Sequence, residues 1–205
     1  MTGAADATVR AFLAVDLPEP ARQCALAAAE ALREALELDA RWAPPEQLHL
    51  TLKFLGDVTS DALAALARNA GGRLAAEKPF AVTVGGIGAF PSNRQARILW
   101  MGVQDGQPAL ARLARKLDRS AGRIGVERDR RPYRAHVSLA RLRDAVLVRL
   151  DQVATPDPVS FPVEEVVLYE SRLAGTGATH VPLARLPLGL EGRDAFDPHE
   201  LAPEL

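Results

Sequence analysis

The chain has 205 residues and a mass of 22.0 kDa, with 48% hydrophobic residues, 25% charged residues and a formal net charge of −1. These values are typical of a globular protein with one sizeable core, or with two lobes that share an interface. No apolar run is long enough to span a membrane, and the first residues lack the basic and apolar regions of a signal peptide, so we expect a cytoplasmic protein.

The first third of the chain alternates apolar runs with helical segments. An apolar run at 11–15 ends at a proline-containing turn, and residues 20–38 favour a helix in which the single Cys24 is a small buried residue. Two prolines then precede a predicted strand at 48–55. Ser60 and Asp61 indicate the start of a second helix, and Gly71-Gly72 indicates a weakening near its end.

The remainder of the chain repeats this alternation. Residues 80–84 and 97–103 predict two strands, and residues 85–88 between them are interpreted as a strand-end bulge or turn, because the rest of a phosphate-binding loop is missing. Residues 108–121 predict an amphipathic helix, followed by an arginine-rich loop, a strand at 135–141 and a short helix at 144–153. Strands at 163–168 and 180–188 complete the pattern, and the acidic residues 191–205 are expected to form a flexible tail.

Two of the predicted strands carry the same motif. Leu48-His49-Leu50-Thr51-Leu52 and Ala135-His136-Val137-Ser138-Leu139 both read His, aliphatic residue, hydroxyl residue, Leu. A single His on a half-buried strand is usually structural, but a core has no reason to repeat a face that pairs an imidazole with a hydroxyl. The repetition therefore favours a functional site.

Strand periodicity predicts how these side chains are oriented. Residues two apart project from the same face, so each His shares a face with the hydroxyl residue of its motif. The opposite face points into a core, and it is expected to carry Leu50, Leu52, Phe54, Val137 and Leu139. Two such strands across a cleft would present two imidazoles and two hydroxyls to one small anion.

The motifs and their surroundings resemble one known group of enzymes. His49-Leu50-Thr51-Leu52 and His136-Val137-Ser138-Leu139 are similar to the paired motifs of the two-histidine phosphoesterase superfamily. Residues 11–18, 41–48, 53–56 and 88–91 resemble the LigT-like RNA 2′,3′-cyclic phosphodiesterases, once described as 2′-5′ RNA ligases. The resemblance extends from about Arg10 to Leu188.

The resemblance implies a bilobal α+β fold, in which antiparallel sheets of two pseudo-symmetric lobes face a central cleft and the helices lie outside. Residues 1–190 would form this single domain, with 191–205 as the acidic tail. The sequence departs from the family at two positions. Ala135 stands where the family commonly has Pro, which leaves the backbone before His136 less rigid, and Ser138 replaces the usual Thr but keeps its hydroxyl.

Opening a 2′,3′-cyclic phosphate needs a base that activates water and an acid that protonates the leaving ribose oxygen, and imidazole suits both roles near neutral pH. The residues alone leave the assignment open, but the resemblance implies His49 as proton donor, His136 as proton acceptor and a 2′-phosphate product. Thr51 and Ser138 would donate hydrogen bonds to the phosphate oxygens. No cofactor or metal is expected, because neither His has a carboxylate or Cys cluster at ligand spacing beside it.

Other residues near the motifs have secondary interpretations. Lys53 shares the predicted face of His49 and is a candidate for added positive charge, although a solvent-facing lysine is favoured. Arg141 has the opposite parity to His136 and is interpreted as structural. The candidates for stacking on a base are Tyr133, Phe12 and Tyr169, and no catalytic role is assigned to His180 or His199.

Positive charge is concentrated around the second motif. Between Arg112 and Arg149 there are 12 Lys and Arg against 4 acidic residues, whereas residues 191–205 hold five acids and one Arg. This block suits a polyanion such as RNA. Arg112, Arg115 and Arg119 are interpreted as a solvated helix face, and for residues 128–134 RNA binding and a solvated loop remain equally open.

The leading interpretation is therefore a monomeric, metal-independent enzyme that acts on RNA or a nucleotide with a 2′,3′-cyclic phosphate and does not involve a membrane. A second interpretation is 2′-5′ RNA ligation, because an acid and a base work in both directions. A third is an RNA-binding or nucleotide-binding module without turnover, although binding alone would not need both His and both hydroxyls.

Overall fold

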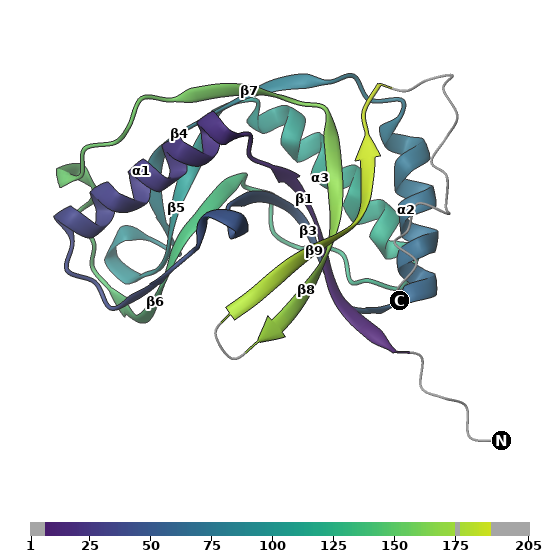
Figure 1. The fold of residues 1–205 in the computed structure, drawn as a ribbon, viewed down its shortest axis with the longest axis horizontal. Coiled ribbons are helices and arrows are strands. Elements are labelled where there is room, and N and C mark those ends of the chain that lie inside the picture. Colours follow the sequence, from purple (N-terminus) through teal and green to yellow (C-terminus); the bar gives the residue numbers. More distant parts are fainter. Residues whose placement is uncertain (1–6, 175–176, 190–205) are drawn as a thin grey trace.

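A computed structural model describes residues 7–174 and 177–189, so the predicted tail at 191–205 and His199 lie outside the described residues. This part of the chain contains nine strands and three α-helices (Figure 1). The helices are α1 (Glu19–Ala35), α2 (Ser60–Leu74) and α3 (Gln107–Gly122). The strands are β1 (Thr8–Asp16), β2 (Ala40–Trp42), β3 (His49–Thr59), β4 (Phe80–Phe90), β5 (Ala96–Asp105), β6 (His136–Val146), β7 (Val159–Val163), β8 (Glu165–Ala174) and β9 (Gly177–Pro187).

Local sequence explains where the helices begin. Pro20 lies in the first turn of α1, where its missing N–H costs no hydrogen bond. The N-cap of α2 is Thr59, whose side chain accepts a hydrogen bond from the Ala62 N–H at 3.4 Å. Gly106 precedes α3 with φ of 86°, a left-handed conformation that glycine adopts without strain.

The strands form two antiparallel groups that are joined at a single point. The order is β7-β4-β5-β6-β3-β1-β8-β9, and β2 pairs with β6. Only one residue pair, Leu50 with Val137, links β3 to β6. One lobe therefore contains β1, β3, β8 and β9, and the other contains β2, β4, β5, β6 and β7.

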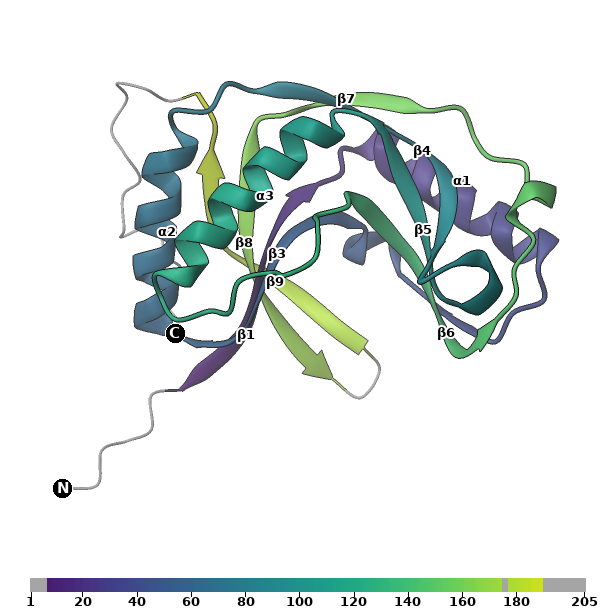
Figure 2. The same cartoon turned by 180° about the vertical axis from the view of Figure 1, so that it is seen from behind.

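The lobes are not successive halves of the chain. Helix α1 packs against β4, β6 and β7, although it follows β1 of the other lobe, whereas α2 and α3 pack against β3 and α2 also against β9 (Figures 1 and 2). The C-terminal strands β8 and β9 return to pair beside β1. The predicted bilobal α+β fold is confirmed, with lobes built from interleaved segments.

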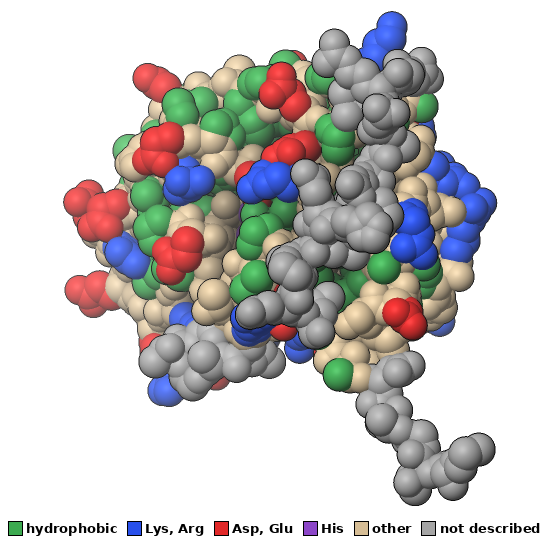
Figure 3. Space-filling model, turned by 45° about the vertical axis from the view of Figure 1, so that its right-hand side comes forward, with side chains coloured by type: hydrophobic (Ala, Val, Ile, Leu, Met, Phe, Trp, Pro, Cys, Tyr) green, Lys and Arg blue, Asp and Glu red, His purple; other side chains and the backbone are tan. Residues whose placement is uncertain are grey.

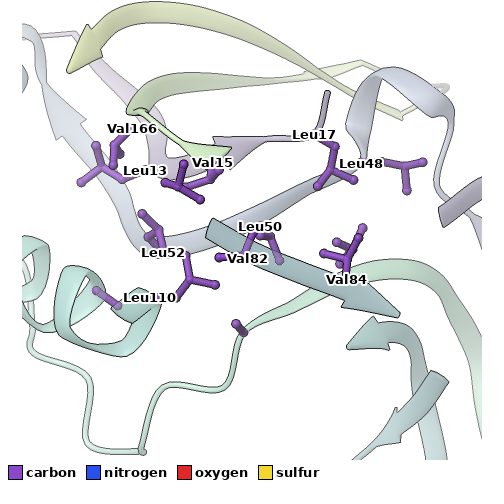
Figure 4. Close-up of a cluster of buried hydrophobic side chains, with 14 of the residues drawn as sticks. Leu13, Val15, Leu17, Leu48, Leu50, Leu52, Val82, Val84, Leu110 and Val166 are labelled. Atoms are coloured by element: carbon purple, nitrogen blue, oxygen red, sulfur yellow. The ribbon is translucent and has the colours of Figure 1, made fainter. Parts of the chain in front are cut away.

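The hydrophobic core is continuous between the lobes. Figure 4 shows Leu13 and Val15 of β1, Leu50 and Leu52 of β3 and Val166 of β8 close to side chains from β4 and α3, namely Val82, Val84 and Leu110. Leu13 and Leu50 are fully buried. Burial of one such side chain contributes about 1.5–3 kcal/mol, so this core holds the two motif strands at their junction.

Both motif strands contain a β-bulge, which changes the predicted orientation of the residues that follow. In β3 the register passes from Ala14–Thr51 to Leu13–Lys53, and in β6 it passes from Trp100–Ser138 to Leu99–Ala140. The skipped residues are Leu52 and Leu139, which occupy the same place in the two motifs. A bulge inserts one residue and reverses the alternation beyond it.

Three predictions made from simple alternation are therefore wrong. Phe54 does not point into the core, because 68% of it is exposed, whereas Lys53 is 2% exposed and lies on the core side. Arg141 is exposed between the buried Ala140 and Leu142, so the bulge places it on the face of His136 and not on the opposite one.

Smaller differences occur elsewhere. The predicted helix at 144–153 is the end of β6 followed by a short 3-10 helix, Leu150–Gln152. Helix α2 continues past Gly71-Gly72 to Leu74. Residues 85 and 86 form a bulge, as predicted, although it lies within β4 and not at its end. Cys24 is buried as predicted, and none of the helices among the described residues is long and apolar enough to cross a membrane.

Candidate active site

The two motifs meet at the Leu50–Val137 pair. These two residues have the same place in their motifs, so a local two-fold axis that relates the motifs passes between them. Neighbours of an antiparallel pair also face one another, which brings each imidazole toward the hydroxyl residue of the other motif. The charge of His136 contributes to lowering the pKa of His49, as expected for two imidazoles that lie near each other.

His49 is half-buried and held by contacts on several sides. Its Nε2 lies 2.9 Å from Thr51 Oγ1, and its ring forms a hydrogen bond with the backbone of Gln47. The ring stacks on Phe12 with centroids 4.9 Å apart, and it meets the ring of His180 edge-on at 5.2 Å. The orientation of this imidazole is therefore fixed by packing as well as by hydrogen bonds.

His136 has a corresponding arrangement. Its Nδ1 lies 2.8 Å from the Arg134 carbonyl oxygen, and its ring meets Phe90 edge-on at 4.9 Å. A carbonyl can only accept, so Nδ1 carries the proton, and in the neutral ring Nε2 has a free lone pair. Each imidazole thus forms a hydrogen bond with the backbone of the residue two positions before it: His49 with Gln47, and His136 with Arg134.

Both imidazoles favour the neutral form in the unliganded protein. Burial lowers the pKa of His49 to about 4, together with the charges of His180 and His136. The hydrogen bond with the Gln47 backbone has a smaller, opposing effect. Burial is also the largest cause of the lowered pKa of His136, with a smaller contribution from the charge of Arg134. A negative charge between the two rings would counteract these effects.

A cavity of about 90 Å³ lies beside His49. Its lining includes Asp16, Tyr169 and His180, and the Tyr169 hydroxyl donates a hydrogen bond of 2.7 Å to Asp16. Burial lowers the pKa of His180, so the cavity contains a second imidazole that tends to be neutral. Sequence patterns do not predict His180 here, because it comes from β9 near the end of the described chain.

Two of the three aromatic candidates for base stacking have other roles. Phe12 is buried between the rings of His49 and Tyr169 and so supports the catalytic candidate. The Tyr133 hydroxyl donates to the Thr51 carbonyl oxygen at 3.1 Å, which ties the loop before His136 to the first motif. Tyr169 lines the cavity and remains a candidate.

The bulges add two residues to the motif face. Beyond Thr51 this face continues to Phe54, whose ring lies 6.1 Å from that of Phe12, and beyond Ser138 it continues to Arg141. An exposed aromatic ring and a guanidinium thus occupy equivalent places on the two strands. Sequence reasoning missed both because it assumed unbroken alternation.

Lys53 anchors the loop that leads to His136. Its Nζ lies 2.9 Å from Asp118 Oδ1, 3.0 Å from Asp129 Oδ2 and 2.9 Å from the Glu127 carbonyl oxygen. Asp118 also accepts hydrogen bonds from Arg128 Nε and the Asp129 N–H, each at 3.0 Å. The start of the loop is therefore fixed to α3 and β3 by a network of charges in which Lys53 and Asp118 are nearly buried and the loop residues are exposed.

Gln107 fixes the other end of this loop. Its Oε1 accepts from the Ala135 N–H at 3.1 Å, and its Nε2 donates to the Tyr133 carbonyl oxygen at 3.4 Å. A proline at position 135 would have no N–H to offer. Ala135, which stands where the family commonly has Pro, is thus held by the side-chain amide of Gln107 in α3.

Within residues 7–174 and 177–189, no three His, Cys, Asp or Glu side chains form a group that could hold a metal ion. The site itself offers two imidazoles, two hydroxyls, an arginine and aromatic rings. This set is suited to proton transfer and to contacts with an anion.

The chain is similar to known proteins over most of its length. The family model described as LigT like Phosphoesterase matches residues 15–100 and 102–179. The RNA 2′,3′-cyclic phosphodiesterase of Methanothermobacter thermautotrophicus is 32% identical over 180 residues, covering 85% of this chain and 96% of that protein. The protein of the same name from Escherichia coli is 32% identical over 190 residues, covering 87% and 96%.

Solved structures agree with the sequence comparison. The crystal structure of Escherichia coli LigT in its apo form superposes with a TM-score of 0.71 at 31% identity, covering 89% of this chain and 98% of that one. The same protein in complex with 3′-AMP gives a TM-score of 0.71 at 30% identity, covering 88% and 98%. The chain belongs to the family of LigT-like phosphoesterases.

Proposed function

We propose that this chain hydrolyses 2′,3′-cyclic phosphates of RNA or nucleosides to 2′-phosphates, with His49 as general acid and His136 as general base. The observation that carries the proposal is the Leu50–Val137 pair, which sets two equivalently bonded imidazoles about one local two-fold axis. The names of the relatives, RNA 2′,3′-cyclic phosphodiesterases, support the same reaction.

The general base is His136. Because Nδ1 donates to the Arg134 carbonyl, Nε2 of the neutral ring is free to accept a proton from the attacking water. The lowered pKa keeps this imidazole neutral at neutral pH. Water would then attack phosphorus in line with the leaving ribose O3′.

The general acid is His49, which must carry a proton before the ribose O3′ can leave. Its pKa of about 4 makes the cation rare in the free protein. The negative charge of the cyclic phosphate raises this pKa on binding, so the substrate itself promotes the protonated form. Donation of the proton to O3′ as the P–O3′ bond breaks leaves the phosphate on O2′.

The phosphate is held by the polar groups of the same face. Thr51 and Ser138 donate hydroxyl hydrogen bonds to the non-bridging oxygens, whose charge increases in the transition state. The Arg141 guanidinium is suited to the same oxygens because its planar donors match phosphate geometry. Phe54, exposed beside Phe12, offers a ring on which the base next to the cyclic phosphate can stack.

Ligation is the less favoured alternative, since the relatives are named for the hydrolytic reaction. A binding module without turnover would need neither a free Nε2 on His136 nor a second imidazole across from it. The cytoplasmic location and the monomeric state expected from the sequence stay predictions.

The test is hydrolysis of a nucleoside 2′,3′-cyclic phosphate in excess EDTA, with chromatographic separation of the 2′- and 3′-phosphate products. Wild type should form only the 2′-phosphate, and His49→Ala and His136→Ala should each lose about 10²–10⁴-fold in kcat. His199→Ala, to which no role is assigned, is the matched control. Retained activity in both variants, or activity that requires an added divalent metal, would refute the proposal.

A further inference from the structure

A group of arginines lies away from the two imidazoles, at the C-terminal end of α3. These arginines line an open hollow of about 380 Å³. Its lining consists of four arginines together with Gly122, Gly125 and Val126, and the arginines are Arg73 of α2, Arg119 and Arg123 at the end of α3, and Arg128 of the following loop. None of the lining residues is acidic.

Most of this positive charge has no carboxylate partner. Arg128 is paired with Asp118 at 3.0 Å, but Arg73 bonds only to the neutral Asn69 amide oxygen, at 3.2 Å. Arg119 and Arg123 form no side-chain hydrogen bond or ion pair with the described residues. Figure 3 shows Lys and Arg side chains gathered along one edge of the molecule, on the side opposite most of the Asp and Glu side chains of that face. Three guanidinium groups from α2 and the end of α3 thus converge without a carboxylate partner, and such a concentration of positive charge attracts anions.

The hollow is connected to the active site by a run of arginines. Figure 2 shows the loop that joins α3 to β6. Arg128 of this loop lines the hollow, and His136 follows eight residues later, a span of at most about 29 Å. Arg130, Arg131 and Arg134 lie exposed along the loop. The Arg134 guanidinium lies over Trp100 at 5.0 Å, and the Arg134 carbonyl holds the His136 ring.

We propose that this arginine hollow binds a backbone phosphate of the RNA chain upstream of its cyclic end, with the α3–β6 loop guiding the strand between the two sites. The inference rests on the proposed function and specifies its substrate as an RNA chain end in preference to a free nucleotide. The hollow has no aromatic ring in its lining, so it reads backbone charge and not base identity.

Contacts far from the reacting phosphate bind substrate and transition state equally, so loss of the hollow should raise KM with little change in kcat. The variant is Arg119→Gln/Arg123→Gln. The matched control is Arg112→Gln/Arg115→Gln, which removes the same charge from exposed positions of the same helix outside the hollow.

With an RNA oligomer that ends in a cyclic phosphate, kcat/KM of the hollow variant should fall about tenfold at low salt, while the control stays within about twofold of wild type. With the cyclic mononucleotide both variants should match wild type, which separates this inference from the proposed function. The slope of log(kcat/KM) against log[salt] for the oligomer should become shallower by about 0.7, the change expected when one phosphate contact is lost.

Fluorescence anisotropy with a labelled RNA oligomer that ends in a 2′-phosphate measures the same contact without turnover, and the hollow variant should bind about tenfold more weakly. Equal effects in the two double variants would overturn the inference, because net charge alone would then explain them. Unchanged oligomer binding would overturn it as well. Tighter oligomer binding by the hollow variant would overturn it too, because the arginines would then not attract the RNA backbone.

Discussion

At the scale of single residues, the site depends on two imidazoles that the unliganded protein keeps neutral. The pKa of His49 is about 4 and that of His136 lies below its ordinary value of 6.5. Acid–base catalysis needs one ring protonated and the other neutral. The kcat/KM profile reports the free enzyme, and the kcat profile reports the substrate complex.

We therefore predict a bell-shaped kcat/KM profile with its maximum on the acid side of neutrality. Activity falls at low pH because both rings become protonated, and it falls at high pH because neither ring then carries a proton. The kcat profile should lie at higher pH, since bound phosphate raises both pKa values. The check is steady-state kinetics from acid to mildly alkaline pH, and a kcat/KM maximum above neutrality would contradict the depressed pKa of His49.

Gln107 is a positioning residue for the proposed base. Removal of its amide in Gln107→Ala leaves the Ala135 N–H without its partner and frees the backbone just before His136. A misplacement of about 1 Å can cost 10²-fold, so kcat should fall by up to about that factor with KM nearly unchanged. Steady-state kinetics with a cyclic mononucleotide provide the measurement.

The second substitution Ala135→Pro should restore much of the lost activity of Gln107→Ala, because proline has no N–H to satisfy and a fixed φ. Gln23→Ala, which alters an exposed glutamine of α1, is the control. If Gln107→Ala keeps full activity, or if the proline fails to raise it, Gln107 does not act by fixing this backbone.

At the scale of elements, alternation correctly predicted the two motif strands up to Thr51 and Ser138, and the burial of Leu50 and Val137. Alternation failed beyond Thr51 and Ser138 because each strand contains a bulge that the residue types at these positions do not predict. The bulge shows only in the pairing with the neighbouring strand, where Leu52 of β3 and Leu139 of β6 are passed over. Phe54 and Arg141 therefore lie on the same face as the two His residues, and Lys53 lies on the core side.

The burial of Lys53 makes its ion pairs important for stability. Burial would raise the pKa of Asp118, but hydrogen bonds from Lys53, the Asp129 N–H and Arg128 lower it overall. Removal of the lysine in Lys53→Met leaves Asp118 without its buried cation, and we expect a loss of about 3 kcal/mol in the free energy of unfolding. Urea denaturation measures this loss.

Two comparisons make this prediction specific. Lys116→Met removes a partly exposed lysine that pairs with Glu77, and it should cost less than about 1 kcal/mol. The contribution of Asp118 is present above its unfolded pKa and is lost as pH falls through its lower folded pKa, so the deficit of Lys53→Met should shrink in acid. Equal losses for the two lysine variants would contradict the role assigned to Lys53.

At the scale of the whole molecule, the chain interleaves its segments so that each lobe presents one motif strand. The family resemblance implied two pseudo-symmetric lobes, but local sequence patterns could not predict that β8 and β9 return beside β1 or that α1 covers the opposite lobe. Those arrangements depend on long-range packing of apolar surfaces, which local patterns do not encode. The single Leu50–Val137 pair then leaves the His49 and His136 faces adjacent while their strands diverge.

In the proposed mechanism, one lobe supplies the acid His49 and the other supplies the base His136. The most direct test uses a 2′,3′-cyclic substrate in which sulfur replaces the 3′ bridging oxygen, because a thiolate with a conjugate-acid pKa of about 8.5 can leave without a proton. His49→Ala should hydrolyse this substrate at nearly the wild-type rate, a recovery of at least about 10²-fold over its rate on the oxygen substrate, whereas His136→Ala should stay inactive. Equal defects in both variants, or recovery in His136→Ala instead, would contradict the assignment.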